Sequence, residues 1–478
     1  MPGPFAPRRP TLIGAAAGTC LAVGIAGWAP PAGAQDPGGM RLTIDITPRI
    51  AVESNPGLDI DNPGTRVTAS IPLRFGFDSE TRRQSLSVFG GLTPRVFDDP
   101  TRDDRFDLGD RDIGFAYQRN AATAMFDLSG SYARSDIDFM RPLEDFLVAI
   151  EDEDGEIVDV ELDLPDDLEN LDGRGTRERL ELDTRLELGM DRRSGITFDA
   201  SLRETTYSEE VAATDTRRLA FSAAPRLTIS PVTEVTITAN WSRFENDNPA
   251  QTRRDRRSLI FGIDHAFSRT LGLSAGLGPN RVETREFGET DTVDGFDSNF
   301  TLSYDRSRGD ISLSGSSRVN QDGTRTEARI GGNFERPVWR VGGDVGVTRS
   351  PQGDVNMVGR IDYRQDLPRG DFGLQARRAV ATRADDQDRL RTVFRADYEH
   401  TINNISGIGL EASFVRIGGE DGAGQTERVA LGATYRREFT EDWTMNLGYR
   451  YRSRSIDKGD AQAHEVFLFL DRGFNFRL

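Results

Sequence analysis

Thiol chemistry is the first thing that this sequence lacks. Its one cysteine, Cys20, lies in an apolar stretch near the N-terminus, so the rest of the 478 residues contains none. A chain without cysteine has no disulfide, no thiol nucleophile and no thiolate metal site.

Catalytic motifs are missing as well. No G-x-S-x-G, HExxH, phosphate-binding loop or dinucleotide fingerprint occurs. Of the three histidines, His265 and His400 fall near short turns, and His464 stands beside Glu465 near the last loop. A catalytic dyad needs a base and a nucleophile within hydrogen-bond reach, and this pattern does not provide one. The sequence therefore predicts no enzyme activity and no cofactor.

Basic residues and long apolar runs are also scarce. Lys458 is the only lysine, and the formal net charge is −18, which argues against a nucleic-acid partner. After residue 28 no stretch reaches the roughly 18 apolar residues that a transmembrane helix requires.

The N-terminal segment has the features of a secretory signal peptide. Arg8 and Arg9 precede an apolar run from Leu12 to Trp28, and Ala32-Gly33-Ala34 forms a small-residue cleavage site. Residues 1–34 are therefore predicted to be removed on export, and 35–478 to form the mature domain.

The mature sequence alternates between apolar and polar residues almost everywhere, which is typical of β-strands with one apolar and one polar face. One such segment places Met445, Leu447, Tyr449 and Tyr451 opposite Asn446, Gly448, Arg450 and Arg452. Alternation alone does not separate a soluble sandwich from a membrane barrel.

The spacing of turns favours the barrel. Short turn signals occur at 78–83, 118–123, 191–195, 230–234, 268–271, 305–310, 335–338, 366–370, 401–406 and 440–442. Longer polar stretches alternate with them, for example 55–66, 97–110 and 245–257. Ten short turns and eleven longer loops predict an all-β, antiparallel up-and-down barrel of about 22 transmembrane strands, with short periplasmic turns and longer extracellular loops.

Aromatic residues and the C-terminus favour the same fold. Eight aromatics lie within a few residues of a short turn, where a ring at the membrane–water boundary is expected: Phe77, Tyr117, Phe267, Tyr304, Phe334, Tyr363, Tyr398 and Phe439. The chain ends FLFLDRGFNFRL, and Phe474, Phe476 and Leu478 continue an apolar row to the last residue. We interpret this segment as the strand that closes the barrel and faces lipid.

Signal peptide, strand ladder and terminal strand together resemble a Gram-negative outer-membrane β-barrel. The opening LTIDITPRIAVESNPGLDIDNPG resembles the start of the β-barrel porin type 2 group, some members of which are associated with exopolysaccharide export. A TonB-dependent transporter also has 22 strands, but it carries a globular plug before the barrel. Strand-like sequence begins here at about Arg41, so no such plug is expected, and no autotransporter passenger is visible.

Two charged features are candidate functional sites. Nine arginines on polar faces are predicted to line the lumen: Arg360, Arg364, Arg377, Arg391, Arg395, Arg436, Arg450, Arg452 and Arg454. They form either a salt-bridged wall or a ladder that favours anionic solutes.

The second feature is the acidic segment 136–172, which contains 16 Asp or Glu residues and one Arg. It reads as a hairpin that turns at Asp154-Gly155, and it carries Asp152, Asp154, Glu156, Asp159, Glu161 and Asp163. It is an acidic surface loop, a constriction folded into the lumen, or a divalent-cation site that bridges to lipopolysaccharide.

These observations predict an outer-membrane channel for passive passage or export of polar, anionic or saccharide solutes. The alternative is a non-conducting structural or surface-interaction barrel. The expected partners are outer-membrane lipid, lipopolysaccharide and the barrel-assembly machinery, which would read the C-terminal strand.

Overall fold

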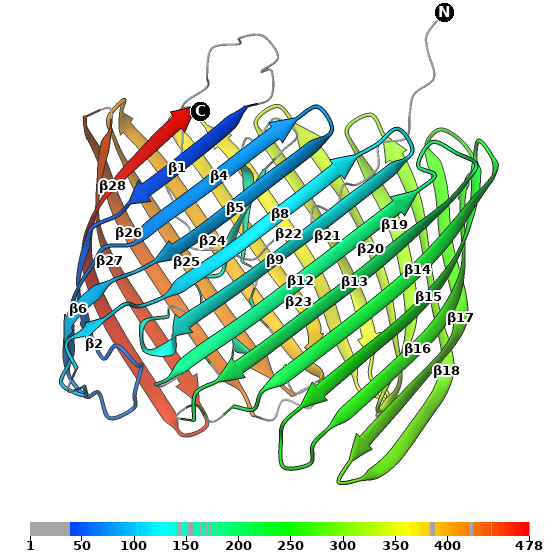
Figure 1. Cartoon of the computed structure of the whole chain (residues 1–478), viewed down its shortest axis with the longest axis horizontal. Helices are drawn as coiled ribbons and strands as arrows, with labels where there is room; N and C mark the ends of the chain where they lie inside the picture. Colours follow the sequence, from blue (N-terminus) through cyan, green and yellow to red (C-terminus); the bar gives the residue numbers. More distant parts are fainter. Residues whose placement is uncertain are drawn as a thin grey trace, which may run out of the picture.

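The alternating sequence forms strands along most of the mature chain in the computed structural model (Figure 1). The structure describes residues 39–478 apart from 103, 141, 142, 144, 152–156, 163, 166, 169, 170, 172, 173, 210, 212, 383–387, 420–423, 441 and 478. The predicted signal peptide lies outside the described residues. Among the described residues, no helix is both long and apolar enough to cross a membrane.

The first four barrel strands are each broken into two segments. They are β1 (Met40–Ile46) with β2 (Arg49–Ser54), β3 (Thr65–Ser70) with β4 (Leu73–Thr81), β5 (Gln84–Leu92) with β6 (Arg95–Asp98), and β7 (Phe106–Asp107) with β8 (Arg111–Asn120).

The other barrel strands are continuous. They are β9 (Ala124–Asp136), β12 (Thr176–Leu188), β13 (Ser194–Tyr207), β14 (Thr216–Ser230), β15 (Thr233–Asn246), β16 (Arg253–Ala266), β17 (Leu271–Glu286), β18 (Glu289–Arg306), β19 (Gly309–Asn320), β20 (Gly323–Arg336), β21 (Trp339–Arg349), β22 (Val355–Leu367), β23 (Gly370–Thr382), β24 (Asp388–Asn403), β25 (Ser406–Gly418), β26 (Thr426–Thr440), β27 (Trp443–Ile456) and β28 (Gly459–Arg477). The sheet of 26 segments, four of which are second halves of broken strands, thus has 22 strands.

The first and last strands close the barrel. β28 pairs antiparallel with β1 and β2, and its register places Phe476 opposite Leu42 and Phe474 opposite Ile44. The predicted antiparallel 22-stranded barrel is confirmed. Phe474 and Phe476 lie on the closing strand as expected, and Leu478 lies outside the described residues.

Prolines cause three of the four strand breaks. Pro48, Pro72 and Pro94 lie in the two-residue gaps just before the second halves of adjacent strands, and proline has no N–H to donate to a sheet. Their carbonyls still accept bonds from the neighbouring strand: Leu470 donates to Pro48 over 3.0 Å and Ile71 donates to Pro94 over 2.9 Å. The breaks therefore form one row across the wall, and the sheet remains continuous through it.

The two ends of the barrel differ in their connections. Ten connections at one end are short, as the turn signals predicted, and eleven connect the strands at the other end. Three of these eleven are two-residue turns, at 287–288, 321–322 and 457–458, so the expectation of uniformly longer loops was wrong there. The stretch 245–257, expected to be a loop, is mostly strand, because β15 ends only at Asn246 and β16 already begins at Arg253. Phe287 and Gly288 both have positive φ, 50° and 86°, which suits a tight hairpin.

The wall has an apolar outer face and a polar inner face. Phe221, Phe261, Leu277 and Phe296 are 46%, 53%, 56% and 64% exposed on the outside. Four predicted aromatics near the short turns are exposed as well: Phe267, Tyr304, Phe334 and Phe439. At about 4.8 Å between strands tilted by about 40°, a 22-stranded barrel is roughly 45 Å across, too wide for wall side chains to fill.

Candidate functional site

Described residues of the connection between β9 and β12, residues 137–175, contact the inner side of the barrel wall. The connection begins with a 3₁₀ turn, η1 (Ile137–Phe139), and continues into a hairpin of β10 (Leu147–Glu151) and β11 (Ile157–Leu162). The predicted hairpin is therefore present, with Leu147 opposite Leu162. We call residues 137–175 the inner loop.

The inner loop packs its leucines on a distant part of the wall. Leu143, Leu164, Leu168 and Leu171 form one apolar cluster with Val415, Ile417 and Ala430 of β25 and β26. Leu168 is fully buried. Burying a leucine side chain contributes roughly 1.5–3 kcal/mol relative to leaving it in water, so this cluster favours the docked position of the loop.

Two wall arginines bind the backbone of the inner loop. Arg391 of β24 donates from Nη1 to the Leu164 carbonyl and from Nη2 to the Pro165 carbonyl, both over 3.1 Å. Arg428 of β26 donates to the Leu168 carbonyl over 3.4 Å. These bonds satisfy loop carbonyls that the apolar cluster would otherwise remove from water.

A buried ion pair holds the end of the inner loop against its own strand. Arg177 of β12 donates from Nε and Nη2 to the two carboxylate oxygens of Asp167, over 2.6 and 2.8 Å. The Tyr207 hydroxyl also donates to Asp167. Because the loop is attached both here and on β24–β26, it spans part of the lumen.

The start of the inner loop is enclosed by three arginines. The Phe139 ring lies 3.5 Å from the Arg95 guanidinium carbon and 4.1 Å from that of Arg66, and it meets Phe97 edge-on at 5.2 Å. Arg66 also donates to the Asp138 carbonyl over 2.9 Å. Arg102 donates to the Asp138 carboxylate over 2.9 Å.

Burial makes this start of the loop sensitive to pH. Burial, with help from the Asp136 carboxylate, raises the pKa of Asp138 from 3.8 to about 6. The docked loop therefore binds a proton more tightly than an undocked one, so its extra stability is complete below about pH 4 and is lost as the pH rises through 6. We expect amide exchange at 137–140, corrected for intrinsic rates, to be slower at pH 5 than at pH 8. Asp138→Asn should weaken this dependence, and an unchanged pH dependence in that variant would contradict the assignment.

A second loop, residues 55–64, also covers the wall from within. Leu58 packs on Ala461 and Ala463 of β28, and its carbonyl accepts a 2.8 Å bond from Arg454 Nη2. Asn55 donates to the Gln462 carbonyl over 3.0 Å, which fixes the loop to β28.

Two buried carboxylates join the strands at the closing seam. Glu465 of β28 lies between Arg49 of β2 and Arg450 of β27, with 2.9 Å between Arg450 Nη1 and Glu465 Oε2. Glu53 lies between Arg452 and Arg66, with 3.0 Å between Arg66 Nη2 and its Oε2. Glu465 is 1% exposed, so its two arginines are needed to compensate for burying its charge.

All nine predicted lumen arginines lie on the inward side of their strands, as the register shows. For example, Arg360 pairs with Arg377, and Ala430, which contacts the inner loop, pairs with Arg452. Six form ion pairs with carboxylates of the described residues: Arg360, Arg364, Arg395, Arg436, Arg450 and Arg452. Arg391 and Arg454 bind loop carbonyls. Within the described residues, most of the set therefore stabilises the wall and its loops.

A polar vestibule lies on the inner side at the loop end. It is a cavity of about 980 Å³ whose lining includes Arg254, Arg325, Asp354, Asp388 and Arg389. Arg325 and Asp388 form an ion pair at 3.0 Å, which joins the start of β24 to β20. Charges of both signs line this entrance to the lumen.

The remaining predicted site residues cannot be placed in a metal site. Asp152, Asp154, Glu156 and Asp163 lie outside the described residues, and Asp159 and Glu161 are described only as part of β11. Elsewhere in the described chain, no group of three His, Cys, Asp or Glu residues could hold a metal ion.

The histidines do not form the dyad considered from the sequence. The buried Glu465 lies on the inner face, whereas its neighbour His464 lies on the outer face, where it contacts the Tyr449 hydroxyl at 2.8 Å. His265 and His400 contact Thr233 and Tyr398.

The fold is shared with solved outer-membrane receptors. The FrpB iron transporter of Neisseria meningitidis (F5-1 variant) aligns with a TM-score of 0.57 at 9% identity, over 92% of this chain and 83% of that one. A point mutant of the ferric enterobactin receptor of Pseudomonas aeruginosa aligns at 0.53 and 8%, over 92% and 81%. The siderophore receptor PirA of Acinetobacter baumannii aligns at 0.52 and 7%, over 91% and 80%.

At these identities the likeness shows the barrel fold alone. No family model matches the chain, so the resemblance to the β-barrel porin type 2 group stays a prediction from about twenty residues. No curated protein matches it either.

Proposed function

We propose that this protein is an outer-membrane barrel of a Gram-negative bacterium that passes polar solutes through a lumen narrowed by the inner loop. The observation that carries the proposal is a polar, ion-paired inner wall in a barrel too wide for its side chains to fill, crossed by a loop attached at both sides. Passage would be passive, without a cofactor or a catalytic step. The solute would enter through the polar vestibule and be selected by size and charge at the inner loop.

The net charge of the inner loop bears on selectivity. Segment 136–172 has a net charge of −15, whereas most of the predicted lumen arginines are already paired. With the loop docked, the constriction would therefore favour neutral or cationic polar solutes, and anions would be favoured only when the loop is displaced. Saccharides fit this chemistry, and export of an exopolysaccharide remains a hypothesis from the family resemblance.

A second candidate is a barrel that does not conduct. The attachment of the inner loop to Arg391, Arg428 and the β25–β26 cluster favours it, since the loop would then block the lumen permanently. Conductance of the purified protein in planar bilayers tests the proposal. Discrete single-channel currents would support passage. The absence of channel currents at every voltage and pH tested would overturn the proposal. The structurally similar receptors and transporters support the barrel fold, and they do not distinguish between the two candidate functions.

The proposed orientation places the short turns in the periplasm, and it can be tested on whole cells. Epitopes inserted at Pro249 or Gly424, which lie in connections at the loop end, are expected to be labelled by antibody on intact cells. Epitopes at Arg193 or Pro337, in short turns at the other end, should be labelled only after permeabilisation. Labelling of the Arg193 epitope on intact cells would reverse the orientation.

A further inference from the structure

The outer face of β16 changes abruptly from apolar to charged. Leu259, Phe261 and Ile263 are 37%, 53% and 41% exposed and belong to the apolar belt. Alternate residues of a strand share a face, so the next three outward positions towards the loop end are Arg257, Asp255 and Arg253. A change of this kind on one strand face marks the level at which hydrocarbon gives way to lipid headgroups.

Like charges face one another across β16 and β17 beyond this level. Arg257 is opposite Arg281, Asp255 is opposite Glu283, and Arg253 is opposite Arg285. Like charges directly opposite one another destabilise a sheet. Two of the three pairs, Arg257 with Arg281 and Arg253 with Arg285, are positive, and an anionic group bound at either pair would compensate for the repulsion between its arginines.

Internal ion pairs compensate for only part of it. Asp255 accepts bonds from Arg243 Nε at 2.8 Å and from Arg253 Nε at 3.2 Å. Arg281 binds both oxygens of Asp294, at 2.7 and 3.0 Å. Arg257 and Arg285 are exposed, and neither forms an ion pair within the part of the chain that the structure describes.

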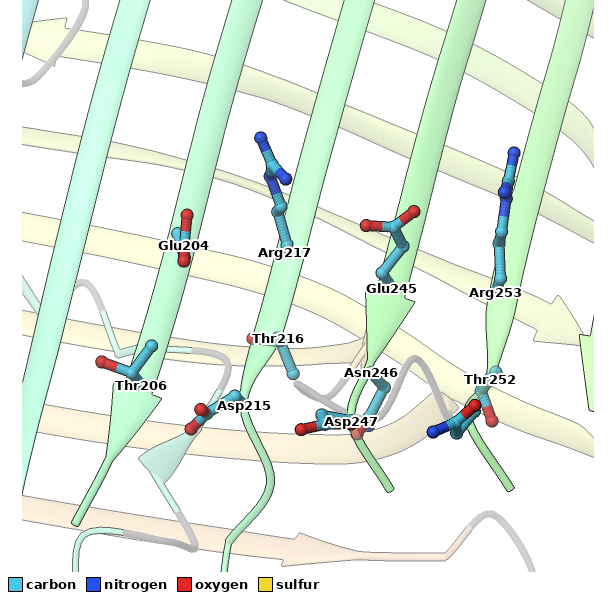
Figure 2. A pocket seen from close by; sticks show the side chains of 11 residues that line it. Glu204, Thr206, Asp215, Thr216, Arg217, Glu245, Asn246, Asp247, Thr252 and Arg253 are labelled. Carbon is cyan, nitrogen blue, oxygen red and sulfur yellow. The ribbon is translucent and has the colours of Figure 1, made fainter. Parts of the chain in front are cut away.

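The charged surface continues onto the neighbouring strands. Glu204, Arg217, Glu245 and Arg253 lie in one row across β13–β16 (Figure 2) and are successive register partners. They line a depression of about 370 Å³ at the loop end. We call these arginines and carboxylates the outer charged patch: Arg217, Arg253, Arg257 and Arg285 with Glu204, Glu245, Asp255 and Glu283.

We propose that the outer charged patch binds the phosphate groups of lipopolysaccharide in the outer leaflet. Arginine is suited to this role because its planar guanidinium donates two parallel hydrogen bonds to a phosphate. A lipid is favoured over a protein partner because the patch continues the apolar belt on the same strand face, where acyl chains would cover Leu259 and Phe261 while phosphates reach Arg257. The inference rests on the proposed outer-membrane location with the loop end outward.

The test compares lipid binding by Arg257→Ser/Arg285→Ser with that by the whole wild-type chain. Each protein is folded in detergent, and bound lipid A is measured by native mass spectrometry, with dephosphorylated lipid A and phosphatidylglycerol as comparison probes. The double variant is expected to bind lipid A about tenfold more weakly, since each arginine near an anionic surface contributes to attraction. Phosphatidylglycerol, with one phosphate, should bind more weakly than lipid A to the wild-type chain.

Matched variants exclude trivial causes. Arg82→Ser/Arg83→Ser removes two exposed arginines at the opposite end and should leave binding unchanged. Arg257→Lys/Arg285→Lys keeps the charge but loses the paired hydrogen bonds, so its binding should lie between that of the wild type and that of the serine variant, which separates a phosphate site from a folding defect. The proposal is overturned if the serine variant binds lipid A as well as the wild type does, if dephosphorylated lipid A binds equally well, or if the patch instead joins two copies of the chain. Conductance in phosphatidylcholine bilayers tests passage independently of this site.

Discussion

Replacing residues 140–173 with a Gly-Ser turn is expected to raise single-channel conductance several-fold. The ends of the inner loop are already adjacent, because Ile137 N donates to the Gly175 carbonyl over 2.9 Å, so a short turn can close the gap without moving β9 or β12. The deletion removes the constriction and most of the acidic groups of segment 136–172. Selectivity should therefore shift towards anions, most strongly at low salt, since the Debye length is about 8 Å at physiological ionic strength.

Single substitutions distinguish the effect of detaching the inner loop from the effect of removing its volume. Arg391→Ala removes two charge-assisted bonds to the loop backbone, each contributing about 1.5–3 kcal/mol, and should produce frequent transitions to a larger conductance. Arg360→Ala is the matched control, since it removes an inward arginine that forms an ion pair with Asp362 of its own strand. Unchanged conductance and selectivity after the full deletion would show that the inner loop does not restrict passage.

Phe476→Arg is expected to prevent accumulation of the barrel in the outer membrane. Phe476 is 46% exposed on the outer face of β28 and lies opposite Leu42 at the seam. An arginine facing lipid costs about 2–4 kcal/mol at the bilayer midplane and less near an interface. This cost arises on β28, the strand that pairs with β1 to close the barrel. The substitution also removes one side chain of the apolar row at the C-terminus.

A control on the same strand distinguishes lipid exposure from charge alone. Asn475 lies opposite Thr43 on the other face of the strand, towards the lumen, so Asn475→Arg should assemble nearly normally. Heat-modifiable, folded barrel would be measured on gels of outer-membrane fractions. Normal amounts of folded Phe476→Arg would contradict the assignment of this face to lipid.

The sequence predicted the wall well because the wall follows from local rules. An alternation of period two specifies which side chains share a face, and turn residues specify where a strand reverses, so the strand number, the ten short turns and the closing role of Phe474 and Phe476 could all be derived. Strand lengths were less accessible. Charged residues such as Arg253 and Arg257 resemble a loop in sequence, yet they continue β16 beyond the apolar belt.

Contacts between distant segments could not be predicted from the sequence. The acidic segment 136–172 was compatible with a surface loop, a cation site or a constriction, and its fate depended on whether leucines such as Leu168 found an apolar surface. That surface, Val415, Ile417 and Ala430, lies some 250 residues away in the chain. Arg66, Arg95 and Arg428 were missed as loop ligands for the same reason, since nothing in their local pattern differs from that of other wall arginines.

The sequence by itself determined which side chains share a strand face, and thereby a closed sheet with an apolar outer face and a charged inner face. The tertiary structure decided what those inward charges do. At the seam, Glu53 forms an ion pair with Arg452 and Glu465 forms one with Arg450. Arg391 and Arg454 donate hydrogen bonds to loop carbonyls. The physical reason is that periodicity acts between near neighbours in the chain, whereas an ion pair forms only when barrel closure brings its two partners within about 4 Å of one another.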